Sequence, residues 1–455
     1  MNYFALLSML ALAACAAAPV ANAPATRAMV ADSALPPMKV FSAPRPVTPQ
    51  MSNGNIAADF LSLHFQLESG RTLPVFTRFE GPVTVGVTGQ PPDSLGPDLA
   101  RLLSRLRSEA QVDIRQVGPD APEANIVIEA VSRTDIRQAL PQAACFVVPN
   151  VTSLAEYRRF RRSDRINWAR LTERQQMAIF LPYDASPQEV RDCLHEELAQ
   201  ALGPLNDLYR LRESVFNDDN VHNVLTGFDM LILRATYAPS LRSGMTREEV
   251  AARLPRILST LNPGGDGLGE RPQAVTPRNW ITAVQAALDP GTGVAQRRSA
   301  ATDAMRIAQD LNWSDHRRAF SHYIVGRLIQ GYDPDLAQRH FAIAQRYFDE
   351  TPGTELHQAY LAAQTAAYAI TRGDGDTALR KIAPALPVAR NAENAALLAT
   401  LMLLQAEAYT LTGQHETARA VRLDSLGWAR YGFGSDWAVR AKMREISGLT
   451  PAPRS

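Results

Sequence analysis

The sequence predicts an α+β region over residues 55–250, followed by an all-α region over residues 280–447. In the first region, short apolar runs rich in Val and Ile alternate with segments of helical periodicity. Beyond Trp280 the chain becomes rich in Ala, keeps the helical period and shows almost no strand signal. With 455 residues, of which 46% are hydrophobic and 20% charged, the chain has enough apolar material for two packed cores.

The predicted elements of the α+β region alternate along the chain. Strand-like runs, bounded by polar or turn-forming residues, are expected at 82–87, 112–115, 125–130, 145–148 and 176–181. Helical periodicity predicts helices over 56–68, 98–109 and 186–202. The last helix has the clearest boundaries: Ser186 is an N-cap residue, Pro187 occupies the first helical position, and Gly203 is placed to end the helix.

The all-α region contains a weak internal repeat. A Gly recurs a few residues before an Ala three times, and Ala337, Ala378 and Ala418 lie 41 and 40 residues apart. A Gly allows the turn between two helices, and small residues let the helices approach closely. The spacing therefore predicts an irregular array of helical hairpins that resembles tetratricopeptide repeats, with a plain helical bundle as the alternative.

The N-terminus predicts a lipid anchor. Residues 5–14 form an apolar run that is too short to span a bilayer and leads into Leu-Ala-Ala-Cys, which resembles a bacterial lipobox. Residues 1–14 are therefore expected to be a signal peptide, and Cys15 is expected to be acylated and held by membrane lipid. The protein would then face the periplasm, and the residue after Cys15, which is not Asp, favours the outer membrane. The alternatives are an ordinary signal peptide cut near Ala23 or an uncleaved apolar tail.

Three further segments are expected to lie outside the two folded regions. Residues 15–54 are rich in Ala and Pro and have no period, which is typical of an extended tether. Residues 251–279 contain a cluster of Gly and Pro and are interpreted as a linker. Residues 448–455 are expected to form a tail.

The predicted helix over 186–202 carries a motif that resembles a zinc-peptidase sequence but lacks its ligands. His195-Glu196 would fit only if a second His stood four residues after His195, and that position is Ala199. Shifted by one residue, the run from Glu196 to Asp207 resembles the metzincin pattern H-E-x-x-H-x-x-G-x-x-H-D. The three ligand positions are then held by Glu196, Gln200 and Asn206, the general-base position by Glu197, and the glycine of the turn by Gly203.

The same run and two later stretches resemble the family called domain of unknown function 2927. The stretches that carry the resemblance are 193–203 with 206–207, then 214–218 and 233–246. The resemblance covers roughly residues 60–250. It implies a zincin-like bacterial protein that is secreted or lipid-anchored, and it implies no particular reaction.

The altered motif leaves several functions open. The neutral amides of Gln200 and Asn206 bind zinc poorly, and with Glu196 they would suit a harder ion such as calcium, bound weakly. We therefore favour a hydrogen-bonded structural remnant or a binding surface, without a cofactor. A site for another divalent metal, or a hydrolytic site without metal, comes second. An ordinary zinc peptidase would require the fold to recruit His195 or His222.

The cysteine count predicts an anchor and a disulfide. Three cysteines are too few for a thiolate zinc site. Once Cys15 is acylated, Cys145 and Cys193 remain in an oxidising compartment, where they are expected to pair. The bridge would close a loop of about 48 residues and contribute about 4 kcal/mol. Two buried free thiols are the alternative.

The charge of the chain excludes nucleic acid as a main partner, because 47 basic residues face 46 acidic ones. Asp207, Asp218 and Asp219 are interpreted as residues of a solvated loop, with cation binding as the alternative. The basic run 158–162 is interpreted as a solvated helix face rather than a contact with lipid headgroups.

Together these features predict a non-catalytic envelope protein. Its helical repeats, its motif cleft or both would bind an unknown protein or peptide partner, and Cys15 would attach it to the membrane. The competing hypothesis is a hydrolase of envelope peptides that uses Glu197 as the general base.

Overall fold

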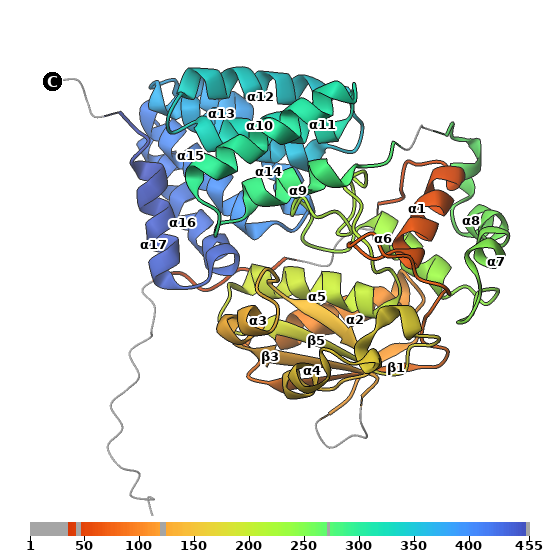
Figure 1. The fold of residues 1–455 in the computed structure, drawn as a ribbon. Coiled ribbons are helices and arrows are strands. Elements are labelled where there is room, and N and C mark those ends of the chain that lie inside the picture. Colours follow the sequence, from red (N-terminus) through yellow and green to blue (C-terminus); the bar gives the residue numbers. More distant parts are fainter. Residues whose placement is uncertain (1–34, 42–46, 119–123, 271–273, 452–455) are drawn as a thin grey trace, which may run out of the picture. The chain divides into compact units, whose positions relative to one another are not determined.

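A computed structural model describes residues 35–41, 47–118, 124–270 and 274–451. The predicted signal peptide and the lipidation site Cys15 lie outside the described residues. In the described part, a mixed α/β region precedes an entirely helical region, as the sequence predicts (Figure 1).

The α/β region is built on a five-stranded sheet with the order β2-β1-β3-β5-β4 in the part of the chain that the structure describes. The strands are β1 (Val83–Gly89), β2 (Ile114–Gln116), β3 (Ile126–Val131), β4 (Phe146–Pro149) and β5 (Met177–Pro182). The first three pairings are parallel, and β4 runs antiparallel to β5 at one edge. All five strands lie where strand-like runs were expected, with ends shifted by one or two residues.

Helices cover both faces of this sheet (Figure 1). One face packs against α2 (Leu95–Ser108) and α5 (Pro187–Leu202), and the other against α3 (Arg133–Ala139) and α4 (Leu154–Phe160). Strand β5 shows why: Ile179 belongs to the first core and its neighbour Phe180 to the second, because successive side chains of a strand point to opposite faces. Helices α2 and α5 were predicted, whereas the short α3 and α4 were not.

Part of the predicted linker over 251–279 belongs to a group of packed helices at one end of the α/β region. The group consists of α1 (Asn53–Phe65), α6 (Gly227–Thr236), α7 (Arg247–Ala251), α8 (Leu254–Leu261) and the 3-10 turn Pro263–Gly267. Leu254 and Leu258 of α8 are fully buried in the same core as Phe60 of α1. The side chain of Asn53 donates to the carbonyl of Asn262 at 3.0 Å. The linker prediction is therefore wrong for residues 254–267, where the glycines lie in a turn packed on α1.

The helical region consists of consecutive helices that pack in pairs (Figure 1). They are α9 (Arg278–Leu288), α10 (Val294–Asp310), α11 (His316–Ile329), α12 (Pro334–Asp349), α13 (Glu355–Thr371), α14 (Gly375–Asn391), α15 (Ala395–Leu411), α16 (His415–Phe433) and α17 (Asp436–Ser447). Gly373 and Gly413 lie in the turns after α13 and α15 with φ of 74° and 77°, a conformation that favours glycine. The repeated Ala337, Ala378 and Ala418 are all buried, so small residues lie where the helices meet.

Residues 35–41, which were predicted to belong to an extended tether, are packed against the helical region. The backbone of this segment lies along α16: the N–H of Lys39 donates to Gly427 at 3.0 Å, and Arg430 donates to the carbonyl of Pro36 at 3.0 Å. Phe41 is 6% exposed and stacks on Trp428 with 4.5 Å between ring centroids. This part of the segment is packed rather than extended into solvent, because Phe41 fits an aromatic pocket that sequence composition does not reveal.

No helix in the described ranges is both long enough and apolar enough to cross a membrane.

Candidate functional site

Helix α5 carries the motif and begins as the sequence predicts. The hydroxyl of Ser186 accepts a hydrogen bond from the N–H of Glu189 at 3.2 Å, and Pro187 occupies the first turn. Cys193 on this helix is joined to Cys145, which directly precedes β4. The predicted disulfide is confirmed, and it fixes the motif helix to the antiparallel edge strand of the sheet.

A buried arginine holds the C-terminal end of α5. Arg174 is 1% exposed, and its guanidinium donates to the carbonyls of Gln200, Ala201 and Gly203. Burial lowers the pKa of Arg174 to about 10, so the group stays charged at neutral pH. The last carbonyls of a helix have no partner within the helix and carry partial negative charge, so a cation stabilises them.

Gly203 is required for close packing at the point where α5 ends. A Cβ atom at this position would lie 2.9 Å from Cγ2 of Thr236 and 3.0 Å from Nε2 of His64. His64 bonds to Thr236 at 2.9 Å, and burial lowers its pKa to about 3. The glycine of the motif therefore lets α1, α5 and α6 meet.

No hydrogen bond in the described structure joins Glu196, Gln200 and Asn206, the three predicted ligand positions. Glu196 and Gln200 lie one turn apart on α5 and share a face of the helix. Asn206, which is 6% exposed, donates from its amide to the carbonyl of Ser62 on α1 at 3.1 Å. In the described ranges, no group of three or more His, Cys, Asp or Glu side chains is placed to hold a metal ion.

His195 and His222, the two histidines considered as zinc ligands, form hydrogen bonds with backbone groups. Nδ1 of His195 accepts the N–H of Leu225 at 3.1 Å, and burial lowers the pKa of this imidazole, with the charge of Arg191 adding to the effect. His222 bonds through Nε2 to the carbonyl of Arg212 at 2.9 Å, and burial lowers its pKa to about 4. Both rings are neutral at pH 7 and hold the loop that follows α5.

Several carboxyl groups gather beside the motif, and we call Glu68, Glu196, Glu197, Asp207 and Asp218 the acidic cluster. Burial, followed by the charges of Asp218 and Glu68, raises the pKa of Glu196 to about 8. Burial, followed by the charge of Glu196, raises the pKa of Glu197 and of Asp207 well above the usual range. Burial and mutual repulsion therefore favour the protonated forms of Glu196, Glu197 and Asp207.

Two oxygens of the acidic cluster lack partners in the described structure. Oε2 of Glu197 and Oδ1 of Asp207 are buried atoms without a hydrogen bond. Glu197 is 5% exposed, whereas Glu68 lies at the exposed edge of the cluster. Sequence reasoning placed Asp207 and Asp218 in an acidic loop but missed Glu68, which precedes them by more than 130 residues.

The predicted solvated loop is wrong for Asp219. Its side chain is 7% exposed and bonds to Nε2 of His357 on α13 at 2.9 Å. Asp218 accepts hydrogen bonds from the hydroxyl of Tyr209 at 2.9 Å and from the amide of Gln285 on α9 at 3.1 Å. The loop after α5 is thus held by side chains of the helical region.

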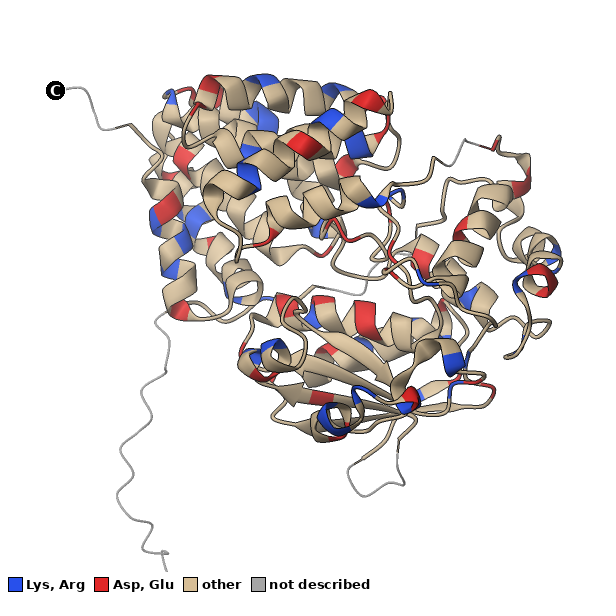
Figure 2. Cartoon of the chain, viewed as in Figure 1, with Lys and Arg blue, Asp and Glu red and all other residues tan. Residues whose placement is uncertain are grey.

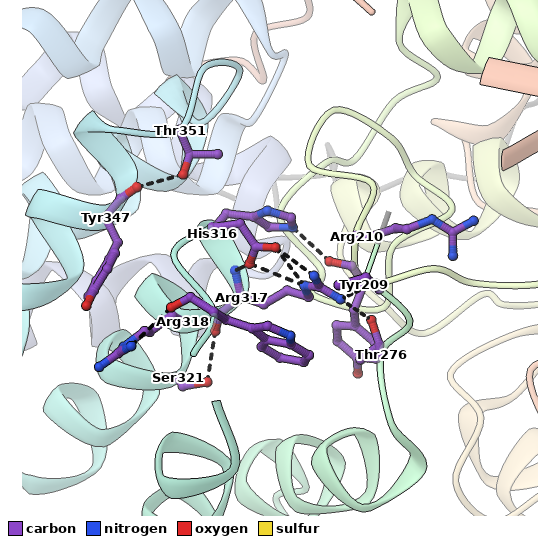
Figure 3. A network of polar contacts seen from close by, with 12 residues as sticks. Tyr209, Arg210, Thr276, His316, Arg317, Arg318, Ser321, Tyr347 and Thr351 are labelled. Carbon is purple, nitrogen blue, oxygen red and sulfur yellow. Dashed lines mark hydrogen bonds and ion pairs between the residues drawn. The ribbon is translucent and has the colours of Figure 1, made fainter. Parts of the chain in front are cut away.

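A second set of contacts fixes the same loop (Figure 3). Nε2 of His316, the first residue of α11, bonds to the carbonyl of Tyr209 at 2.7 Å. The neighbouring Arg317 is 2% exposed and donates to the carbonyl of Ala274 at 2.9 Å and to the hydroxyl of Thr276 at 2.8 Å. The guanidinium therefore holds the chain that enters the helical region, beside the loop.

The first half of α5 binds the helical region directly. Arg191 and Glu393 form an ion pair, and the side chain of Gln188 bonds to both Asn394 and the N–H of Ala396. No local pattern could have revealed these residues, because their partners lie more than 200 positions later.

Residues 53–256 match the sequence model of a family described as a protein of unknown function, DUF2927. The match confirms the resemblance seen in the motif and the two later stretches. It begins with α1 and ends inside α8, so it covers the α/β region. No curated protein matches the chain.

Proposed function

We propose that this protein is a lipid-anchored scaffold of the bacterial envelope. Residues 53–256 would form its rigid base, and the helical hairpins would bind a protein or peptide partner. The observation that carries this proposal is that most motif positions on and after α5 are buried, although Glu196 is partly exposed. Glu197, Gln200 and Asn206 are 5%, 7% and 6% exposed, whereas a peptidase must present its base and metal to a substrate in an open cleft.

The raised pKa of the Glu197 carboxyl also supports a scaffold rather than a peptidase. A general base must be ionised in order to accept a proton. Burial and the charge of Glu196 raise the pKa of Glu197, which favours the protonated form of this carboxyl. Glu197 is therefore poorly suited to activate water, as the hydrolase hypothesis would require.

The fold of residues 53–256 supports a zincin-like ancestry for the α/β region. Strands β1, β3 and β5 are parallel, β4 is antiparallel, and the motif helix α5 follows β5. We infer that the scaffold of a metallopeptidase has been kept while its metal ligands were replaced. The ion pair and amide contacts of Arg191 and Gln188 then hold the helical region on the retained motif helix.

The helical region has features of a binding array. Tetratricopeptide-like hairpins are favoured by the pairing of α11 with α12, α13 with α14, and α15 with α16. Tyr332 and Trp437 are 80% and 74% exposed, so this region offers aromatic side chains to a partner. Basic and acidic residues are interspersed over both regions (Figure 2), which supports a partner other than nucleic acid.

Site-specific photo-crosslinking in cells tests the scaffold. A photoreactive residue at Tyr332 or Trp437 is expected to form a discrete adduct with an envelope protein. The same residue at the exposed Arg161 of the α/β region is the control. Equal adducts at all three positions, or none at Tyr332 and Trp437, would contradict binding by the helical region.

The alternative is a hydrolase, and one observation favours it: the buried Oε2 of Glu197 has no hydrogen-bond partner in the described structure. Elemental analysis of the purified protein beside a Gln200→Ala variant separates the two functions. Stoichiometric zinc that is lost in the variant would contradict the scaffold. Peptidase activity that disappears in Glu197→Gln would do the same.

The anchor is tested independently of either function. Labelled palmitate is expected to enter the wild-type protein and not a Cys15→Ala variant. Incorporation into both proteins would show that Cys15 is not the acylated residue.

A further inference from the structure

A pocket of about 750 Å³ lies apart from the motif and is lined by the end of α6, helix α8 and the turn after α2. One wall is a single face of α8, because Arg253, Arg256 and Thr260 follow each other at intervals of three and four residues. The opposite wall is formed by Arg234 and Tyr237, where α6 ends. The volume is typical of sites for small molecules.

The pocket carries positive charge without a counter-ion in the described structure. Arg234, Arg253 and Arg256 line it, and none of its lining residues is acidic. The nearby carboxylates are engaged elsewhere: Glu109 pairs with Arg105, and Glu249 accepts the N–H of Thr246.

The three guanidinium groups also have hydrogen-bonding capacity to spare. Arg253 donates only to the backbone carbonyl of Glu249 among the contacts of the described residues. Nε of Arg234 is a buried atom with no hydrogen-bond partner in the same ranges. Arginine side chains that line a pocket without an acidic partner can form charge-assisted bonds with an anionic ligand.

The rest of the pocket is apolar. Ala252 in its wall is exposed, whereas Ala110 and Ile257 also line the pocket but are already buried by the fold. Ala238, Pro239 and Leu261 add further apolar surface. The pocket therefore combines a cluster of cations with a surface that gains free energy when an aliphatic group covers it.

We propose that this pocket binds an organic anion in which a phosphate or carboxylate head is joined to an aliphatic tail. The planar guanidinium groups bind such heads through paired N–H donors. The tail would lie against Pro239, Ala252 and Leu261. A membrane lipid and a free single-chain phosphate or acid share this chemistry, and the choice of probe distinguishes them.

Isothermal titration calorimetry of the full chain with octyl phosphate, below its micellar concentration, tests the proposal. Octanol and inorganic phosphate serve as probes of tail and head alone, and each is expected to bind at least about tenfold more weakly. Inorganic phosphate that binds as tightly as octyl phosphate would overturn the role of the apolar wall. A short-chain phosphatidic acid that binds more tightly than octyl phosphate assigns the site to a lipid, and weaker binding assigns it to a free single-chain anion.

Two sets of variants connect the binding to the arginines. Replacement of Arg234, Arg253 and Arg256 by Gln is expected to weaken octyl phosphate binding at least about tenfold. The matched control replaces three exposed arginines elsewhere, Arg161, Arg162 and Arg339, and is expected to bind like the wild type. If the first triple variant does not fold, Arg256→Gln alone, at an exposed position, is expected to weaken binding about threefold. Unchanged affinity in a folded triple variant, or in Arg256→Gln, would overturn the proposal.

Discussion

Arg191 on the motif helix and Glu393, which lies between α14 and α15, form an ion pair with 3.0 Å between Nη1 and Oε2. The two side chains are 1% and 7% exposed, although 202 positions separate them in the sequence. Phe41 and Tyr431 lie on the guanidinium, with ring centroids 5.5 Å and 5.0 Å from its carbon. One buried arginine thus connects the α/β region, the segment 35–41 and the helical region.

Removal of this arginine is expected to destabilise the whole chain. Arg191→Met would leave the carboxylate of Glu393 buried without its partner, which costs about 3–5 kcal/mol. The double variant Arg191→Met with Glu393→Gln is expected to recover part of that loss, because the uncompensated charge is gone. Urea denaturation followed by circular dichroism measures both changes.

A surface pair between α3 and the motif helix α5 provides the control for that experiment. Arg133 and Glu189 form an ion pair with side chains that are 35% and 38% exposed. Arg133→Met is expected to change the free energy of unfolding by less than about 1 kcal/mol. Equal losses in Arg133→Met and Arg191→Met would contradict the special role of the buried pair.

The acidic cluster predicts that stability depends on pH. The pKa of Glu196 is raised from 4.5 to about 8, so the folded protein keeps a proton that the unfolded chain loses between these values. The free energy of unfolding should therefore fall by about 1.4 kcal/mol per pH unit for this group as the pH rises through that window. Glu196→Gln stays neutral, so it should be more stable than the wild type at pH 8 and similar to it at pH 5.

Thermal unfolding at both pH values measures this difference. Glu416→Gln, whose side chain is 86% exposed in the wild type, is the matched control and should follow the wild-type curve. A Glu196→Gln variant that is less stable than the wild type at pH 8 would show that this carboxyl is needed in its charged form, for example by a cation.

The disulfide is expected to contribute substantially to stability. Cys145 and Cys193 are 48 positions apart, and closing a loop of that length removes about 4 kcal/mol of entropy from the unfolded chain. Replacement of both cysteines by Ala should lower the midpoint of urea unfolding accordingly. Addition of a reductant should then destabilise the wild type and leave the double variant unchanged. The same effect of reductant on both proteins would contradict the bridge.

The packed segment 35–41 is expected to loosen when its aromatic contact is lost. Phe41→Ala removes the ring that stacks on Trp428, and truncation of a buried Phe costs about 3–5 kcal/mol. Trypsin should then cleave faster after Lys39, whose backbone is held on α16. Val40→Ala, at a position that is 59% exposed, is the control and should be cleaved at the wild-type rate.

Much of the fold follows from local sequence. The five strands, the helix α5 with Ser186 and Gly203 at its ends, and the helical hairpins around Gly373 and Gly413 all lie where periodicity and turn residues predicted them. The short α3 and α4 were missed because seven residues carry too little period for a clear signal. The linker prediction failed because α8 buries Leu254 and Leu258 and because the Gly/Pro cluster that follows it forms the packed turn Pro263–Gly267.

The residues of the candidate site could be predicted from the sequence, but their burial and protonation could not. The sequence by itself determined that Glu196, Gln200 and Asn206 offer one carboxylate and two amides, because ligand chemistry depends on residue type. It also predicted that Cys145 and Cys193 pair, and the structure joins these two residues. Whether Glu197 is buried, and whether it holds a proton, depends on groups such as Glu68 that arrive from other elements.

Only the tertiary structure decided the contacts over long separations. Arg174 caps the end of α5, Phe41 packs on α16, and Arg191 reaches Glu393. Burial, dielectric environment and the neighbours of a charge are properties of the packed chain, and no local pattern encodes a partner 200 positions away. The same is true of the arginine pocket, in which α6, α8 and the turn after α2 bring three cations together without a carboxylate.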